Sequence, residues 1–230
     1  SSIAATEKNA PDGWICLAFS NHDVVRHVSR WATHGQQDAF ARLAAALLLT
    51  MRGSVCLYQG EELGLTEAEL AFEDLVDPYG IEFWPEFKGR DGCRTPMVWQ
   101  SASHLGAFST APRAWLPVPA AHLPKAVDVQ LQGNDSVLGY YRSMLAFRKR
   151  HAALSKGSIE TLDMPEGVLG FVRREQDEQI LCIYNMTGDA VVVPLPAGLD
   201  PRPLDSPLDA TQPAGGALSL APFGAYIGAL

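Results

Sequence analysis

Hydrophobic and polar positions form blocks along the first 60 residues that predict a strand, a helix and a second strand. Residues 14–19 (WICLAF) are a continuous apolar run, typical of a strand covered on both faces. Residues 37–51 (QDAFARLAAALLLTM) are rich in Ala and Leu and apolar nearly all round, which favours a buried helix. Residues 53–58 (GSVCLY) are a second short apolar run. A strand, a helix and a strand in this order form a βαβ unit with parallel pairing.

Each predicted strand is followed by a polar cluster. SNHD occupies residues 20–23 and QGEE occupies residues 59–62. In parallel α/β folds, active sites lie at the carboxyl ends of the strands. Asn and Asp also occur in ordinary turns, because their side chains bond to nearby backbone groups. The clusters therefore predict either a catalytic rim or a strand-ending turn.

The pattern changes twice in the remainder of the chain. Residues 63–125 show little periodicity and many Pro, Gly and Trp residues, and a loop region of this length is usually functional. Residues 136–151 then have apolar positions at helical spacing, with Asp135 or Ser136 as the expected N-cap and a basic C-terminal end. Beyond this helix, turn signals separate short runs that are typical of an antiparallel sheet, at residues 158–163, 168–174, 179–184, 190–195, 216–220 and 225–230.

These patterns predict two domains. Residues 1–153 form an α/β part and residues 154–230 form an antiparallel β domain, with a Pro-rich surface connection at residues 201–213. The hydrophobic content of 47% is sufficient for a sizeable core.

Charge and cysteine usage exclude several classes of function. The formal net charge of −8 argues against nucleic-acid binding, which requires clustered cations. The sequence has no apolar run of membrane-spanning length and no secretory signal pattern, so no membrane partner is expected. The cysteines are scattered without metal-ligand spacing, which predicts free thiols, no metal site and a reducing, cytoplasmic location.

Three segments together resemble one family. FSNHDVVR (19–26), GSVCLYQGEELG (53–64) and GRDGCRTPMVW (89–99) are similar to segments of the α-amylase superfamily, glycoside hydrolase family 13. The third resembles its oligo-1,6-glucosidase and α-glucosidase branch. The resemblance implies the last two βα units of a (β/α)8 barrel, followed by a small antiparallel β-sandwich. It implies no cofactor.

The resemblance also implies roles for three residues. Asp23 is the expected catalytic carboxylate that stabilises an oxocarbenium-like transition state. His22 and Arg90 are the expected substrate-binding residues, which hold hydroxyl groups of glucose. The alternative for Arg90 and Asp91 is a surface ion pair. Arg26, Tyr58 and Arg94 are interpreted as framework. The resemblance makes Glu61 and Glu62 a structural strand end, with a role as catalytic acid or base as the alternative. For Trp84, Phe87 and Trp99, core packing is the default over sugar stacking.

The expected activity is that of a retaining, exo-acting α-glucosidase that hydrolyses or transfers glucose by double displacement. The substrate is an α-glucoside or a short malto- or isomalto-oligosaccharide. No segment resembles the family's nucleophile or acid/base segments, and a full barrel needs roughly 250 residues. We therefore expect this chain to be the C-terminal portion of a longer enzyme. It is expected to be inactive alone and to need the N-terminal barrel portion from the same or a separate chain.

Other functions remain open from sequence. A transglycosylating relative, such as an isomaltulose or trehalulose synthase, differs in acceptor-side loops that the sequence does not reveal. An amylase-like fold also serves as a non-enzymatic chain, as in the heavy chains of amino-acid transporters. A truncated chain that only binds sugar is the third alternative.

Overall fold

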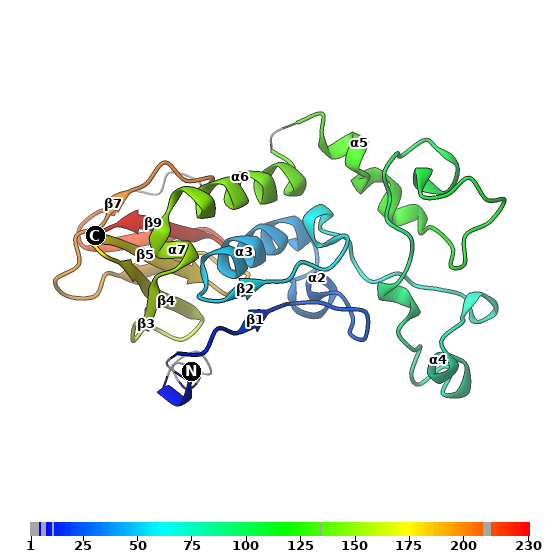
Figure 1. Cartoon of the computed structure of the whole chain (residues 1–230), viewed down its shortest axis with the longest axis horizontal. Coiled ribbons are helices and arrows are strands. Elements are labelled where there is room, and N and C mark those ends of the chain that lie inside the picture. Colours follow the sequence, from blue (N-terminus) through cyan, green and yellow to red (C-terminus); the bar gives the residue numbers. More distant parts are fainter. Residues whose placement is uncertain (1–4, 6–7, 11, 134, 209–212) are drawn as a thin grey trace. The chain divides into compact units, whose positions relative to one another are not determined.

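The computed structural model describes residues 5, 8–10, 12–133, 135–208 and 213–230 (Figure 1). Its contacts divide the chain into two compact units. The first unit contains the described residues of 1–17, 42–56 and 142–230, and the second contains residues 18–41 and the described residues of 57–141. This division follows contacts rather than chain order, and the domain boundary after residue 153 stays a prediction.

The predicted βαβ unit is present in the first half of the chain. Strands β1 (Cys16–Leu17) and β2 (Ser54–Val55) pair in parallel, with Cys16 opposite Ser54. Helix α3 (Gln37–Thr50) lies between them in sequence, as the apolar run predicts. The short helix α2 (His27–Trp31) before α3 was not predicted.

The expectation that residues 14–19 are covered on both faces is wrong for the described structure. Exposed and half-buried positions alternate through this run, and Trp14 is largely accessible. Only two residues of each strand are paired. The alternation shows that one face of this two-stranded sheet is accessible to solvent.

Helix α6 (Val137–Arg150) confirms the predicted helix, and Ser136 is its N-cap because its Oγ accepts a hydrogen bond from the Gly139 amide at 3.0 Å. The basic end is more than a solvated surface. The Arg148 guanidinium donates to the carbonyls of Leu49, Met51 and Gly53 at 2.7, 3.1 and 3.0 Å. It thereby satisfies carbonyl groups at the C-terminal end of α3 and in the turn before β2.

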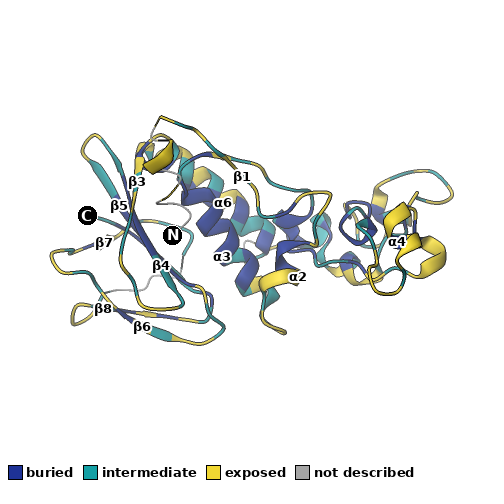
Figure 2. Ribbon diagram, turned by 90° about the horizontal axis from the view of Figure 1, so that it is seen from below, coloured by how far each residue is buried: buried dark blue, intermediate teal, exposed yellow. Residues whose placement is uncertain are grey.

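The C-terminal residues form two antiparallel sheets that share one core (Figure 2). The larger sheet has the order β3-β4-β5-β9-β7, and the smaller pairs β6 with β8. Side chains from both sheets, including Leu181, Ile183, Val193 and Leu218, pack together, so the arrangement is the expected sandwich. The strands are β3 (Ser158–Thr161), β4 (Val168–Glu175), β5 (Glu178–Asn185), β6 (Val191–Pro194), β7 (Arg202–Pro203), β8 (Ala217–Leu220) and β9 (Ala225–Ala229).

Strand β7 is a correction to the sequence interpretation, which placed residues 201–213 in a surface connection. Arg202 and Pro203 pair with β9 at the edge of the larger sheet. An edge position tolerates proline because no further strand needs its amide. The last part of the predicted connection, residues 209–212, lies outside the described residues.

The second unit contains the irregular region. Short helical turns replace long elements, and a cluster of Leu63, Leu65, Met97, Val98 and Ala126 forms its core. Two of these turns are α-helical, α4 (Pro78–Glu82) and α5 (Val127–Gln130). The others are short 3-10 helices at Glu61–Leu63, Phe72–Asp74, Asp91–Cys93, His104–Ala107 and Ala120–Lys125. Helix α7 (Ala152–Ser155), in the first unit, precedes the sandwich. Across the residues described, no helix is both long and apolar enough to cross a bilayer.

A buried arginine connects the elements of the first unit. Arg173, on β4, has no solvent exposure and donates to the carbonyls of Leu154, Gly157 and Ser158 at 3.0, 2.8 and 3.0 Å. It also donates to the carbonyl of Thr50, the last residue of α3. Burial lowers the pKa of Arg173 to about 10, so the guanidinium stays charged at neutral pH.

Replacing Arg173 with alanine is expected to lower the free energy of unfolding by about 3–5 kcal/mol, because four carbonyl groups lose their donor. Urea titration followed by circular dichroism measures this change. Arg174→Ala is the matched control, since Arg174 is half-buried and pairs with the exposed Glu160, and it should change stability by less than about 1 kcal/mol. Equal effects of the two variants would contradict a structural role for the buried network.

A second buried group makes the stability of the other unit depend on pH. His122 is almost fully buried and its Nε2 lies 2.9 Å from the Thr66 carbonyl oxygen. Burial, with a smaller contribution from the positive charge of Arg26, lowers the pKa of His122 to about 4. The imidazole is therefore neutral in the fold at pH 5–8, and folding opposes its protonation.

Because the folded pKa lies below the unfolded value of about 6.5, the contribution of His122 is complete above pH 6.5 and is lost as the pH falls toward 4. The loss should reach about 3 kcal/mol. His122→Gln cannot be protonated in this range, so its stability should fall less steeply between pH 6.5 and 4. Parallel pH profiles for the two proteins, measured by urea unfolding, would contradict this assignment.

Candidate functional site

The Asp23 carboxylate is held by three neighbouring side chains in the second unit. Its Oδ1 accepts from Arg90 Nη1 at 3.1 Å and from Arg94 Nη2 at 3.0 Å. Its Oδ2 lies 3.3 Å from His22 Nε2. The structure therefore brings together Asp23, His22 and Arg90, the three residues predicted from sequence. The Asp23 side chain remains 49% exposed, so a ligand can reach it.

Local turn chemistry orients this carboxylate. The Asn21 Oδ1 accepts the Asp23 amide at 2.8 Å, which is an Asx-type turn. Arg94 fixes the same turn from outside, because its Nε donates to the His22 carbonyl at 2.7 Å. The turn and the cluster of polar side chains are thus parts of one arrangement. The sequence interpretation treated Arg94 as framework and missed its contact with Asp23.

Arg90 is held in place by a buried carboxylate, that of Asp77. Asp77 Oδ2 accepts from the Arg90 amide and from Arg90 Nε, both at 2.8 Å, and Asp77 Oδ1 accepts from Arg90 Nη2 at 2.9 Å. These bonds hold the pKa of Asp77 well below its usual range. With Nε and Nη2 occupied by Asp77, Nη1 is the group that reaches Asp23. The guanidinium also lies 5.3 Å from the ring centre of Tyr79.

Asp91 holds the backbone of the segment that carries Asp77. Its Oδ2 accepts the amides of Val76 and Asp77, both at 2.7 Å, and its side chain is fully buried. The predicted alternative, a surface pair between Arg90 and Asp91, is therefore wrong, because Arg90 pairs with Asp77 and Asp91 holds the backbone that carries Asp77. Gly89 allows this close packing. Its φ is +75°, and a Cβ there would lie 2.8 Å from the Gly80 Cα and 3.0 Å from Asp77 Oδ2.

The chain after β2 makes internal contacts. Arg26 is buried and donates to the carbonyls of Gln59 and Cys93 at 2.6 and 3.0 Å. Glu61 is buried, and its Oε1 lies 3.2 Å from His27 Nδ1. These groups connect the segment after β1 with the segment after β2, as framework residues do.

A cavity of about 710 Å³ lies beside this cluster. His22, Arg94 and Glu62 contribute to its polar wall, and burial raises the pKa of Glu62 above its ordinary value. The remaining wall is mostly apolar and includes Trp99, Phe108 and Trp115, whose exposed fractions are 49%, 47% and 59%. Half-exposed aromatic faces beside polar groups are suited to amphipathic ligands such as sugars.

Two of the aromatic predictions need correction. Core packing, the default for Phe87 and Trp99, is wrong because both side chains are about half exposed. Trp84 is partly buried and packs against Phe72, with 5.7 Å between the ring centres. Phe108 and Trp115 were not singled out, although each is a lone large aromatic in a stretch of small residues and prolines.

The described part of the chain holds no group of three or more His, Cys, Asp or Glu side chains arranged to bind a metal ion. The polar groups around Asp23 are two arginines, an imidazole and the Asp77 carboxylate, which pairs with Arg90. Such a set binds hydroxyl groups and stabilises an anion at a fixed place.

Asp77→Asn is expected to lower the free energy of unfolding by about 2–3 kcal/mol at pH 7, because the charged partner of Arg90 is lost. Asp74→Asn, on the same segment but exposed, is the control and should change stability by less than about 0.5 kcal/mol. Since the folded pKa of Asp77 is depressed, the difference should be complete above about pH 5 and shrink as the pH falls below 4. Urea titrations at pH 7 and pH 3 measure the difference in unfolding free energy between the Asp77 variant and the unmodified protein. An equal difference at the two pH values would contradict the role of the Asp77 charge.

Comparisons with known proteins identify the family of the chain. Residues 2–157 match the α-amylase catalytic domain family, and residues 159–227 match the maltogenic amylase C-terminal domain family. A probable α-glucosidase of Rhizobium meliloti is 56% identical over 188 residues, which cover 81% of this chain and 34% of that protein. A probable oligo-1,6-glucosidase of Bacillus subtilis is 32% identical over 205 residues, which cover 80% of this chain and 36% of that protein.

A solved α-glucosyl transfer enzyme is similar in structure, with a TM-score of 0.92 and 47% identity, over 99% of this chain and 42% of that chain. The chain thus spans about a third of the length of the curated relatives it matches. The catalytic-domain match covers well over half of the chain, and it confirms what the three sequence segments and the αβ-plus-sandwich fold indicate. The chain belongs to the α-amylase family, glycoside hydrolase family 13.

Proposed function

We propose that this chain is the C-terminal portion of a retaining, exo-acting α-glucosidase. The observation that carries the proposal is the Asp23 carboxylate held at 3.0–3.3 Å by Arg90, Arg94 and His22 and still accessible. Cleavage of a glucosidic bond passes through an oxocarbenium-like state, and a fixed anion beside the ring favours the positive charge that develops. Asp23 is the group proposed to supply this anion.

His22 and Arg90 are proposed to hold the glucose unit. The His22 ring is at the rim of the aromatic cavity and in contact with Asp23, so it can bind a hydroxyl of a sugar placed over that carboxylate. Arg90 presents Nη1 to the same place, and Asp77 prevents its side chain from moving away. Because these donors are fixed before substrate binds, little reorganisation is needed when charge develops.

A retaining glycosidase also needs a nucleophilic carboxylate and an acid/base carboxylate about 5 Å apart. Around Asp23, Asp77 pairs with Arg90, and Asp91 and Glu61 are buried and accept internal hydrogen bonds. We infer that the two missing carboxylates lie in parts of the protein other than these residues. The relatives support this inference, because each is roughly three times as long as the matched region.

Transfer of glucose to an acceptor is the second candidate reaction. The aromatic wall of the cavity next to His22 and Arg94 favours this reaction. A sugar acceptor can stack on these rings, whereas water, the acceptor in hydrolysis, gains nothing from them. The acceptor is an α-glucoside or a short malto- or isomalto-oligosaccharide. A non-enzymatic role is less well supported, because it gives no reason for an accessible carboxylate held by three side chains.

In the complete enzyme, Asp23→Asn is expected to lower kcat for p-nitrophenyl α-glucoside by about 100- to 1,000-fold, because the neutral amide cannot stabilise the developing cation. Asp163→Asn, at an exposed position after β3, is the matched control and should change kcat less than about twofold. Circular dichroism verifies that both variants fold. Near-normal turnover of the Asp23 variant would show that the assignment is wrong.

The same assay on the 230-residue chain alone is expected to give no hydrolysis. Activity that stays with the chain through purification would instead point to a carboxylate within it. Glu62, with its raised pKa and its place in the cavity wall, would then be the first to replace.

A further inference from the structure

Glu67 lies on the segment that follows β2, and the proposed chemistry does not use it. Its Oε2 accepts a hydrogen bond from the Arg26 amide at 2.9 Å, and its own amide donates to Ser29 Oγ at 2.7 Å. Arg26 directly precedes α2 and follows Asp23 by three positions. Glu67 is therefore bonded at two points to the segment that continues from Asp23.

The other carboxylate oxygen of Glu67 packs against Gly92. A Cβ at Gly92 would lie 2.5 Å from Glu67 Oε1 and 2.6 Å from the Ala68 carbonyl oxygen, so a larger residue would displace this backbone. The Ala68 amide donates to the Gly92 carbonyl at 3.1 Å. Gly92 is the middle residue of a 3-10 helix that Arg90 and Arg94 flank. Glu67 and Ala68 therefore also contact the turn that carries both arginines of the candidate site.

Arg26 closes a ring of contacts between these segments. Glu67 accepts from its amide, and its guanidinium donates to the Cys93 carbonyl at 3.0 Å. Cys93 directly follows Gly92, which packs against Glu67. Because the ring is closed, a change of the Glu67 side chain alters the spacing between the segment with the aspartate and the segment with the arginines.

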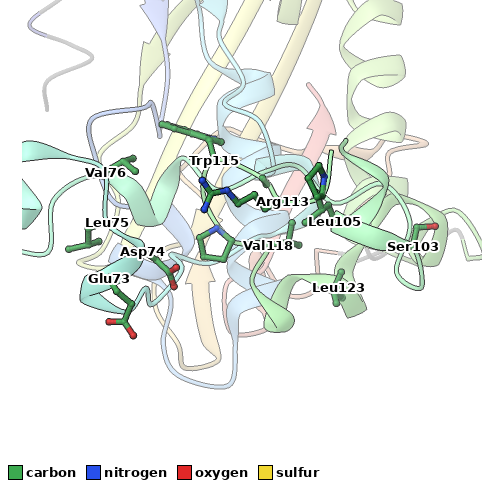
Figure 3. Close-up of a pocket in the computed structure, with 14 residues that line it drawn as sticks. Glu73, Asp74, Leu75, Val76, Ser103, Leu105, Arg113, Trp115, Val118 and Leu123 are labelled. Carbon is green, nitrogen blue, oxygen red and sulfur yellow. The ribbon is translucent and has the colours of Figure 1, made fainter. Parts of the chain in front are cut away.

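A cavity of about 380 Å³ adjoins this ring, and Glu67 and Gly92 are among the residues that line it. Burial raises the pKa of Glu67, and the hydrogen bond from the Arg26 amide and the charge of the Arg26 guanidinium oppose the rise. Leu75 is buried and lines both this cavity and another one, of about 640 Å³, which Figure 3 shows. Because the carboxylate faces a cavity, a shorter side chain at residue 67 would leave the Arg26 amide without its acceptor.

We propose that Glu67 is a positioning residue that sets the separation between Asp23 and the two arginines, Arg90 and Arg94. The inference rests on the proposed function, because it concerns the anion that the proposed reaction needs. The hydrogen bonds from Arg90 and Arg94 to Asp23 are 3.1 and 3.0 Å long. A shift of about 1 Å between the two segments would break them. Glu67 does not line the cavity of the candidate site, and it acts through backbone groups.

Hydrogen exchange of one guanidinium proton tests the proposal in the 230-residue chain. Arg94 Nε donates to the His22 carbonyl at 2.7 Å, so its N–H is protected while the two segments keep their spacing. Glu67→Ala is expected to raise the exchange rate of this N–H about tenfold, measured by NMR at pH 6. The Leu138 amide, which donates to Gln130 Oε1 at 2.9 Å in the same unit, should exchange at an unchanged rate.

Three further variants separate the role of the carboxylate from general effects of substitution. Glu67→Gln keeps an acceptor oxygen at the same reach, and the exchange rate at Arg94 should stay within about threefold of that in the unmodified chain. Glu67→Asp is one methylene shorter and should give an intermediate rate; it replaces the alanine variant if circular dichroism shows that the latter does not fold. Glu69→Ala is the matched control, because Glu69 is exposed and pairs with the exposed Lys88, and it should change the rate less than about twofold.

In the complete enzyme, Glu67→Ala is expected to lower kcat for p-nitrophenyl α-glucoside about tenfold and to change KM less, because the anion is displaced where charge develops. Glu67→Gln should restore most of kcat, and Glu69→Ala should leave it unchanged. Equal acceleration of exchange at Arg94 and at Leu138 would show that Glu67 stabilises the unit as a whole, and it would overturn the proposal.

The positioning role and the proposed function can fail separately. If Asp23→Asn lowers turnover as expected but Glu67→Ala leaves kcat near normal, the proposed function stands and Glu67 has no positioning role. Near-normal turnover of Asp23→Asn would instead count against the proposed function. The positioning role would then be rejected with it, even if exchange at Arg94 responds to the Glu67 variants.

Discussion

The pairing of Asp77 with Arg90 is the interaction on which the site depends. A carboxylate buried at this position would be very costly without partners, and Arg90 supplies three donors to it. The requirement to neutralise Asp77 therefore also fixes the direction of Arg90. One guanidinium nitrogen remains free of Asp77 and reaches Asp23. The hydrogen bonds between Asp77 and Arg90 therefore both stabilise the fold and set the geometry of the candidate active site.

Three other arginines, two of them buried and one half-buried, satisfy backbone carbonyl groups elsewhere in the chain. Arg26 donates to the carbonyls of Gln59 and Cys93. Arg148 donates to carbonyls at the C-terminal end of α3 and directly after it, and Arg173 to carbonyls around α7 and β3. Short strands and one-turn helices leave many backbone carbonyls without partners in their own element. A guanidinium has five donors in one plane, so one side chain can satisfy several of them. This explains how the ends of short elements and the turns between them keep a defined geometry.

Elements with a long hydrophobic pattern in the local sequence could be predicted, whereas very short elements could not. Helices α3 and α6 and the long strands β4 and β5 have clear hydrophobic patterns, and each was found close to its observed bounds. Helix α2 and strand β7 are too short for a period to emerge. Strands β1 and β2 were predicted too long, because apolar composition marks a run but not the number of residues that pair.

The site shows the same division. Asn21, His22 and Asp23 could be found because they are adjacent in sequence and resemble a family segment. Arg90 was found through a second segment of the same family, but its partner Asp77 was not. No local pattern indicates that residue 77 accepts from residue 90, or that Arg94 reaches a carboxylate 71 positions away. Aromatic residues such as Trp115 were missed for another reason, since their exposure depends on the path of the whole irregular segment.

The two interpretations of SNHD, a turn and a catalytic rim, turn out to be compatible. The Asn21 side chain forms the turn that presents Asp23, and the arginines from residues 90 and 94 provide the charge around it. Turn chemistry alone would place a carboxylate at the surface without a defined environment. The arginines alone would have no fixed anion to hold. Because the proposed chemistry needs an anion that is both fixed and accessible, it requires the local turn and the segment 77–94 together, and an alteration of either should change how the sugar is held.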